Sequence, residues 1–395
     1  MIFATLQSYT RSFNSIQMAG IYIHIPFCKK ACHYCNFHFS TSKDGIEKMI
    51  ESIEKEILLR SKLHGSTIGT IYFGGGTPSL IPVKLLNQLL ETIREKFVLT
   101  DEVEITMEAN PDDITTERAL DWKGIGINRF SIGIQSFFES DLLWMNRAHN
   151  AIQSRNCLEI IQATGFNNFS IDLIYGTPGQ TIEQWKENLE IAFDYNIPHL
   201  SCYALTVEEG TALYKMIANN KKEHVDPDMQ SHFFTILMER VREAGYTHYE
   251  ISNFAQPTME SKHNTAYWEG IPYWGFGPSA HSFDGSKRYW NISHNIEYIK
   301  SIENNKVPFE SEILDEIDAL NEYIMTSLRR KNGLNKSFII NRWGMNSFNK
   351  IEEEITPYVN SGKVAKTATH YMLTDEGKFF ADGIASSLFS LKKNN

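Results

Sequence analysis

The sequence contains few cysteines and no long apolar run, and each absence removes a class of protein. Its 5 cysteines among 395 residues are an odd number, which does not suit a disulfide-stapled secreted domain. No apolar stretch reaches the roughly 20 residues that a membrane-spanning helix needs. No internal repeat or low-complexity segment is evident. We therefore expect a soluble globular protein of two or three domains, located in the cytoplasm.

Positive charge is also in short supply. Lys and Arg number 38 against 48 Asp and Glu, which gives a formal net charge of −10. Proteins that hold nucleic acid through its phosphates normally present a basic surface. We therefore expect no nucleic-acid partner.

The first 17 residues lack the features of a signal peptide. They contain one basic residue, Arg11, and no clear apolar core followed by a cleavage site. Met18 directly precedes the first strand-like segment. We expect residues 1–17 to be a poorly ordered extension, and the true start to be either Met1 or Met18.

From residue 21 onward, strand-like and helix-like segments alternate. Short apolar runs typical of strands occur at 21–25, 70–73, 103–107, 129–134, 170–174 and 199–205. Apolar residues recur at helical spacing at 45–59, 83–97, 116–123, 151–163 and 181–193. This alternation predicts an α/β fold with a parallel sheet.

The pattern changes from about residue 311. Helix-like segments at 313–328, 336–343 and 347–358 precede a candidate hairpin at 362–373. Helices followed by a hairpin predict a small winged-helix-like α+β domain. We therefore divide the chain into an extension at 1–17, a main domain at 18–300 and a C-terminal domain at 301–395.

Three of the five cysteines are clustered. Cys28, Cys32 and Cys35 form a C-x3-C-x2-C run just after the first predicted strand. Three thiolates can hold a 4Fe–4S cluster and leave one iron open for a small molecule. A zinc site is the alternative, with His33 or His38 as a fourth ligand. The remaining cysteines, Cys157 and Cys202, lie in apolar segments and are expected in the core.

Other candidate site residues also lie at the ends of predicted strands. A barrel of βα units places its active site at the carboxyl ends of its strands. The glycine turn after the second strand lets backbone approach a ligand closely, although most such turns are only turns. Glu108 could accept hydrogen bonds from a ribose or could be a solvated strand end. Asp172 lies within an apolar strand and needs a partner if it is buried.

The cysteine run resembles the signature of radical S-adenosylmethionine (SAM) proteins. The wider string Tyr22-Ile23-His24-Ile25-Pro26-Phe27-Cys28 is similar to the oxygen-independent coproporphyrinogen oxidase (HemN) group, and nearly the whole chain shares the resemblance. It implies a partial barrel of six βα units, a cluster held by the three cysteines, and SAM bound to the open iron. Matching the family motifs residue by residue implies these SAM-site positions: Tyr22, Tyr34, Gly75, Gly76, Thr77, Glu108, Gln135, Arg147 and Asp172.

Two departures from the oxidases point to another branch of the group. The oxidases carry an extra cysteine two residues beyond the third cluster cysteine, where this chain has Phe37. They also have a long N-terminal region that helps enclose the substrate, whereas only 27 residues precede Cys28 here. The chain looks most like the haem-chaperone branch, and we doubt that it has coproporphyrinogen oxidase activity.

A second motif predicts that the protein binds haem. His263-Asn264-Thr265-Ala266-Tyr267-Trp268 fits the H-N-x-x-Y-W motif associated with haem in that branch. A neutral imidazole can ligate haem iron, and the two aromatic rings could pack against the macrocycle. From residue types alone, a loop histidine is more often structural. The aromatic and glycine-rich segment 273–278 is typical of a packed loop that closes the barrel.

The resemblance implies a haem chaperone that binds haem, a 4Fe–4S cluster and SAM. Its partners would be an electron donor and a haem-acceptor protein, which could be membrane-associated. A porphyrinogen-decarboxylating radical SAM oxidase is the alternative. The sequence leaves open whether SAM is cleaved, how haem is held and whether the chain forms a homodimer.

Overall fold

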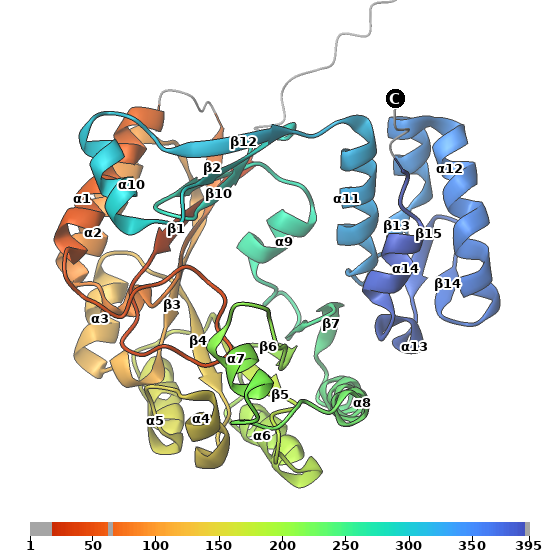
Figure 1. The fold of residues 1–395 in the computed structure, drawn as a ribbon, viewed down its shortest axis with the longest axis horizontal. Coiled ribbons are helices and arrows are strands. Elements are labelled where there is room, and N and C mark those ends of the chain that lie inside the picture. The colour runs from red at the N-terminus through yellow and green to blue at the C-terminus, as the bar shows by residue number, and fades with distance from the viewer. Residues whose placement is uncertain (1–17, 62–65, 392–395) are drawn as a thin grey trace, which may run out of the picture.

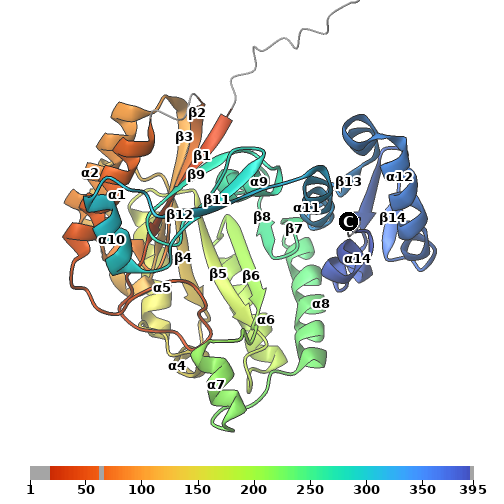
Figure 2. The same cartoon turned by 45° about the horizontal axis from the view of Figure 1, so that its top comes forward.

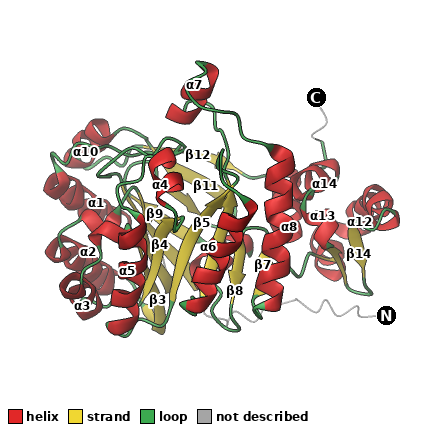
Figure 3. Ribbon diagram, turned by 90° about the horizontal axis from the view of Figure 1, so that it is seen from below, coloured by secondary structure: helices red, strands yellow, loops and turns green. Residues whose placement is uncertain are grey.

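The computed structural model describes residues 18–61 and 66–391, so the expected extension at 1–17 lies outside the described residues. Its largest unit is a curved, open sheet whose first six strands run parallel in chain order, with helices on its outer face (Figure 1, Figure 3). These strands are β1 (Met18–Ile25), β2 (Thr67–Gly75), β3 (Leu99–Ala109), β4 (Arg129–Gln135), β5 (Phe169–Tyr175) and β6 (His199–Ala204). The predicted α/β class with a parallel sheet is confirmed.

The helices between the strands follow the apolar periodicity. In α2, Leu86, Leu89, Leu90 and Ile93 share the buried stripe. Capping boxes start α5 at Asn150 and α6 at Thr181. The main helices are α1 (Ile46–Arg60), α2 (Val83–Lys96), α3 (Thr116–Gly124), α5 (Ala151–Ala163), α6 (Ile182–Asp194) and α8 (Pro227–Glu243).

Several short helices near the strand ends were not predicted from the apolar periodicity. A helix of one or two turns offers too few apolar positions to show a period. They are η2 (Pro78–Leu80), η3 (Pro111–Asp113), α4 (Glu139–Met145) and α7 (Ala212–Ala218).

The sheet continues beyond β1 on one side and beyond β6 on the other. β9 pairs in parallel with β1, and β10, β11 and β12 follow as an antiparallel ladder. The segment expected as a closing loop at 273–278 therefore contains a strand, and the sheet extends past residue 300 to Ile313. The added elements are β7 (Thr247–Glu250), β8 (Asn253–Ala255), α9 (Lys262–Trp268), β9 (Tyr273–Phe276), β10 (His281–Phe283), β11 (Lys287–Asn291), α10 (Asn295–Glu303) and β12 (Phe309–Ile313).

The C-terminal domain has its own apolar core, centred on residues such as Leu320, Ile339 and Tyr371. The predicted hairpin is present, since β14 pairs with β15. The two helices expected within 336–358 follow each other directly, and Gly344 breaks the helical conformation between them. The elements are α11 (Glu316–Leu328), β13 (Leu334–Asn335), α12 (Lys336–Asn360, which includes the break), β14 (Val364–Lys366), β15 (His370–Leu373), α13 (Asp375–Lys378) and α14 (Ala381–Ser387).

The C-terminal domain lies beside the sheet edge at β7 (Figure 2), and polar contacts attach it there. The Arg329 guanidinium lies 3.1 Å from the buried Glu250 carboxylate. The Ile251 N–H donates to the Arg329 carbonyl, and the Lys331 N–H donates to the Tyr249 carbonyl. Across the described ranges, no helix is long and apolar enough to cross a membrane.

Candidate functional site

The cysteine loop is closed at its base by the backbone. The Cys28 N–H donates to the Ser40 carbonyl at 2.9 Å, and the Ser40 N–H donates to the Pro26 carbonyl at 2.9 Å. Between these bonds the loop bulges over the end of β1 and presents three free, half-buried thiols. The two ends of the loop are therefore held together by the backbone of the chain itself.

Neighbouring donors point at two of the three sulfurs. The Thr77 hydroxyl lies 3.5 Å from Cys28 Sγ, and Arg147 Nη1 lies 3.2 Å from Cys32 Sγ. Burial raises the pKa of the Cys28 thiol to about 11 and also raises the pKa of Cys35. Metal coordination removes a thiol proton outright, and the adjacent guanidinium favours the resulting negative charge.

The thiol arrangement distinguishes a cluster from a single ion. Within residues 18–61 and 66–391, no three His, Cys, Asp or Glu side chains are placed to share one metal ion. A zinc ion needs its ligands to converge on one point. In a multi-iron cluster each thiolate binds its own iron. Three separate thiols in one loop match the ligand set that a 4Fe–4S cluster requires.

The glycine turn after β2 is packed against the start of the cysteine loop. Gly76 and Thr77 donate their N–H groups to the carbonyls of Ile25 and Phe27, at 2.8 and 2.7 Å. A Cβ on Gly76 would come within 2.6 Å of the Phe27 carbonyl oxygen. Gly75 has a φ of 104°, which L side chains rarely adopt. These glycines are required by the backbone itself, whatever ligand the turn also approaches.

Glu108 lies near the end of β3, beside this turn. Its carboxylate accepts hydrogen bonds from the Tyr72 hydroxyl at 2.9 Å and from the Gly75 N–H at 3.1 Å. Loss of water around the carboxyl raises its pKa to about 8, with Asp172 adding to the shift. A carboxylate held out of water in this way can accept ligand hydroxyls or balance a ligand cation.

Arg147 connects the cysteine loop to the strand ends. Its Nη2 donates to Asn110 Oδ1 at 2.8 Å and to the Gly133 carbonyl at 2.9 Å. Its Nη1 reaches Cys32 Sγ and, at 3.4 Å, the Tyr34 hydroxyl. The guanidinium is thus fixed at the place where a ligand carboxylate could pair with it.

The next two strands contribute Gln135 and Asp172. Gln135 ends β4 with a φ of 65°, an uncommon conformation for a residue other than glycine, and its side chain is buried. Loss of water raises the pKa of Asp172 to about 6, although hydrogen bonds from Ser201 and Ser131 oppose the shift. Both residues come from strands that run parallel to β3, and Asp172 is near enough to Glu108 to raise its pKa.

The two tyrosines of the predicted SAM site lie on different sides of the site. Tyr34 is in the cysteine loop next to Arg147. Tyr22 is on β1, where its ring stacks on Tyr72 at a centroid distance of 6.1 Å and its hydroxyl lies 3.1 Å from His24 Nδ1. All nine predicted SAM-site positions therefore gather around the cysteine loop or the adjoining strands.

His263 lies on helix α9, not in the loop expected from the sequence. It is 1% exposed. Its Nδ1 lies 2.7 Å from the Thr70 hydroxyl and its Nε2 lies 2.8 Å from the Tyr267 hydroxyl. Both ring nitrogens are thus hydrogen-bonded, and the ring stacks on Tyr72. In this arrangement each ring nitrogen of His263 already has a hydroxyl of the chain as its partner.

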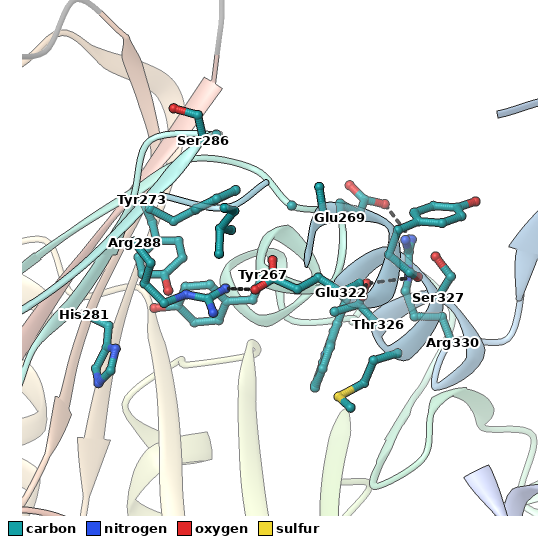
Figure 4. A pocket seen from close by; sticks show the side chains of 18 of the residues that line it. Tyr267, Glu269, Tyr273, His281, Ser286, Arg288, Glu322, Thr326, Ser327 and Arg330 are labelled. Atoms are coloured by element: carbon teal, nitrogen blue, oxygen red, sulfur yellow. Dashed lines mark hydrogen bonds and ion pairs between the residues drawn. The ribbon is translucent and has the colours of Figure 1, made fainter. Parts of the chain in front are cut away.

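A large cavity lies between the barrel and the C-terminal domain (Figure 4). Its volume is about 1130 Å³, slightly above the range of roughly 300–1,000 Å³ that is usual for small-molecule sites. Tyr267 and Trp268 of the haem motif line it, together with Phe37 and His38 from the end of the cysteine loop. The cavity therefore borders the predicted cluster site directly.

Several residues that line these sites were not predicted from the sequence. Tyr72 could have been noticed, because it stands two residues before Gly74 and so shares its face of β2. Asn110 likewise follows Glu108 by two positions. Arg288 and Glu322 in the cavity carry no local signal, because they come from β11 and α11 and meet only in the folded chain.

The comparisons with known proteins agree with this geometry. Residues 22–201 match the family described as the Radical SAM superfamily. The structure is similar to that of coproporphyrinogen III oxidase (HemN) from Escherichia coli, with a TM-score of 0.82, 22% identity, and coverage of 94% of this chain and 90% of that one. At that identity the likeness shows the fold alone, which is the radical SAM barrel.

Sequence relatives define the branch within that class. "Heme chaperone HemW" of Mycobacterium tuberculosis (strain ATCC 25618 / H37Rv) is 32% identical over 94% of this chain and 95% of its own length. The protein of the same name from Bacillus subtilis (strain 168) is 30% identical over 93% of this chain and 98% of its own length. The chain belongs to the HemW family of radical SAM proteins.

Proposed function

We propose that this protein is a cytoplasmic haem chaperone, which binds haem and hands it to an acceptor protein. The observation that carries the proposal is the cavity of about 1130 Å³ beside the cysteine loop, with Tyr267 and Trp268 of the haem motif in its wall. Aromatic walls suit a macrocycle. Relatives over nearly the whole chain bear the name heme chaperone. Free thiols that serve a cluster also need a reducing compartment.

We further propose that Cys28, Cys32 and Cys35 hold a 4Fe–4S cluster and that the strand ends bind SAM. The cluster, when bound, would supply an open iron and an electron. Arg147 would pair with the SAM carboxylate, and Glu108 would accept hydrogen bonds from ribose hydroxyls. The remaining positions Tyr22, Tyr34, Gly75, Gly76, Thr77, Gln135 and Asp172 would shape the pocket. The two buried acids suit a ligand that also carries positive charge.

The second candidate is a HemN-like oxidase, which the likeness of the folds favours. Phe37 stands where the oxidases carry an extra cysteine, and its side chain is 67% exposed at the edge of the cavity. Decarboxylation would use the adenosyl radical at a propionate. A carrier needs only the cavity and a way to release haem.

One experiment separates the two functions. Protein reconstituted with its cluster under anaerobic conditions is titrated with haem and, separately, incubated with coproporphyrinogen III, SAM and a reductant. We expect a saturable change in the haem Soret band and no protoporphyrinogen. Turnover of coproporphyrinogen without stable haem binding would contradict the chaperone function and support the oxidase function. Transfer is then followed by mixing the haem-loaded protein with apo-cytochrome, used as a model acceptor.

A further inference from the structure

One face of the β10–β11 hairpin carries an imidazole, a guanidinium and two aromatic rings. His281 pairs with Trp290 and Phe283 pairs with Arg288 across the antiparallel ladder. Directly paired residues, and residues two apart, point to the same face of a strand. The ring contact between His281 and Trp290 and the position of Arg288 over Phe283 agree with this. Three of the four, His281, Phe283 and Arg288, line the cavity.

His281 differs from the other cavity histidines in its hydrogen bonding. Both ring nitrogens of His24 are engaged, by Tyr22 and by the His38 carbonyl. His370 is engaged by Asn335 and Thr369 at its two nitrogens. His38 uses Nε2 to bind Asn295.

His281 is partly exposed, and among residues 18–61 and 66–391 no hydrogen bond to either of its ring nitrogens is found. Figure 4 shows its ring at the barrel side of the cavity. Partial burial, followed by the charge of Arg288, lowers the pKa of His281, and Glu312 opposes this shift. A neutral imidazole has the lone pair that an iron ligand requires.

Arg288 supplies a cation on the same face. Its Nη2 lies 2.7 Å from Glu322 Oε1 on α11, so this pair bridges the barrel and the C-terminal domain (Figure 4). The Glu322 side chain is 34% exposed and can return to water. An incoming carboxylate could therefore replace it on Arg288 without leaving a buried charge unpaired.

We propose that haem lies against this hairpin face, with His281 rather than His263 as the protein ligand of its iron and with a propionate replacing Glu322 on Arg288. This assignment rests on the proposed haem-carrier function and names the site that serves it. Binding forms one bond from an imidazole nitrogen to iron, with no change in oxidation state, and exchanges one carboxylate for another at Arg288. The aromatic rings of Phe283 and Tyr267 would contact the macrocycle.

The test compares two exposed histidines. Ferric haem is titrated into the wild-type chain, into His281→Ala and into His232→Ala, which changes an exposed histidine on α8 outside the cavity. We expect His281→Ala to shift the Soret band and to weaken binding by at least about tenfold, as loss of a metal ligand should. Added imidazole should restore the band, and His232→Ala should behave like the wild type.

The outcomes separate this assignment from the function on which it rests. A wild type that binds haem while His281→Ala binds equally, with the same spectrum, would overturn the assignment alone. A wild type that binds no haem would overturn both the assignment and the haem-carrier function. Since His281 is exposed on a strand, the variant should fold, and its circular dichroism should match that of the wild type.

A second arm tests Arg288. Wild-type protein should prefer haem to haem dimethyl ester, whose propionates carry no charge. Arg288→Gln should bind the two porphyrins with nearly equal affinity, because it removes the cation that would pair with a charged propionate but not with its ester. An undiminished preference in Arg288→Gln would overturn the propionate contact.

Discussion

The strand ends of the barrel and the cavity beside them differ in how far their polar groups are satisfied within the chain. At the strand ends, Glu108, Arg147 and Asp172 are held by neighbouring donors and acceptors and have lost much of their water. In the cavity, His281 is exposed and Arg288 pairs with a carboxylate that water can replace.

This difference indicates two kinds of binding. Groups fixed in advance suit a cofactor that must be oriented for chemistry, because orientation is then not lost on binding. Exposed or exchangeable groups suit a ligand that must leave again. A carrier with a resident cluster needs both, and the chain places them next to each other.

The largest expected effect is at the strand-end region. Cys32→Ser should abolish the cluster, because three thiolates are the minimum set that leaves one iron open. Anaerobic reconstitution followed by iron and sulfide analysis measures this. The matched control is Cys157→Ser, whose thiol is buried in α5 away from the loop. A full cluster in Cys32→Ser would show that the loop does not hold it.

The next prediction tests whether the buried carboxyl of Glu108 destabilises the folded protein when no ligand is bound. The folded pKa of Glu108 is raised to about 8, so between about pH 4.5 and pH 8 the folded protein binds more protons than the unfolded chain. Stability of the cluster-free protein should therefore fall as pH rises through that window. Glu108→Gln removes the free-energy cost of ionising this buried carboxyl. At about pH 8 the variant should be more stable than wild type by about 3–5 kcal/mol.

Urea unfolding of both proteins at about pH 5 and about pH 8 gives the comparison. Asp172, with its pKa raised to about 6, remains in both. Parallel stability curves for wild type and Glu108→Gln would mean that the carboxyl is well solvated, and the contrast between the regions would weaken.

The third effect concerns the domain that forms one wall of the cavity. Arg329→Ala leaves the buried Glu250 carboxylate without its cation and should cost about 2–3 kcal/mol of unfolding free energy. Arg242→Ala breaks an exposed pair with Asp375 and should cost less than about 0.5 kcal/mol. Equal effects in thermal or urea unfolding would show that burial does not distinguish these contacts.

The smallest expected change in stability, controls aside, is at Tyr267, which lies between the strand ends and the cavity. Tyr267→Phe removes the hydroxyl that satisfies His263 Nε2 and should lower the unfolding free energy by about 1–2 kcal/mol. Because the ring remains, haem affinity should change less than about threefold. Urea unfolding and haem titration measure the two quantities. A large loss of haem affinity with unchanged stability would return the ligand role to the His263–Tyr267 pair.

The parts that the sequence predicted well depend on short separations. Strands β1 to β6 and their helices follow from periods of two and 3.6 residues, and the cysteine run spans eight residues. The strand-end positions followed from the resemblance and from the rule that parallel strands present their carboxyl ends at one edge.

The parts that were not predicted depend on distant partners. β9 is four residues long and has aromatic and glycine residues that suit a loop equally well, and only its pairing with β1 makes it a strand. The contacts of His263 with Thr70 and Tyr267 also went unpredicted, because Thr70 is 193 residues away in the sequence. The position of His281 beside Trp290 could not be predicted either, since it depends on the pairing of β10 with β11.

The pairing of Gly20 with Tyr273 has a consequence for synthesis of the chain. β1 is among the first strands to leave the ribosome, but its β9 edge stays open until about 250 further residues are made, which takes roughly 12–50 s at about 5–20 residues per second. Throughout that interval the strand that carries the cysteine loop offers unpaired backbone to any other extended segment. A chain truncated before Tyr273 should therefore aggregate rather than fold, and nascent chains should depend on chaperones that cover exposed strands.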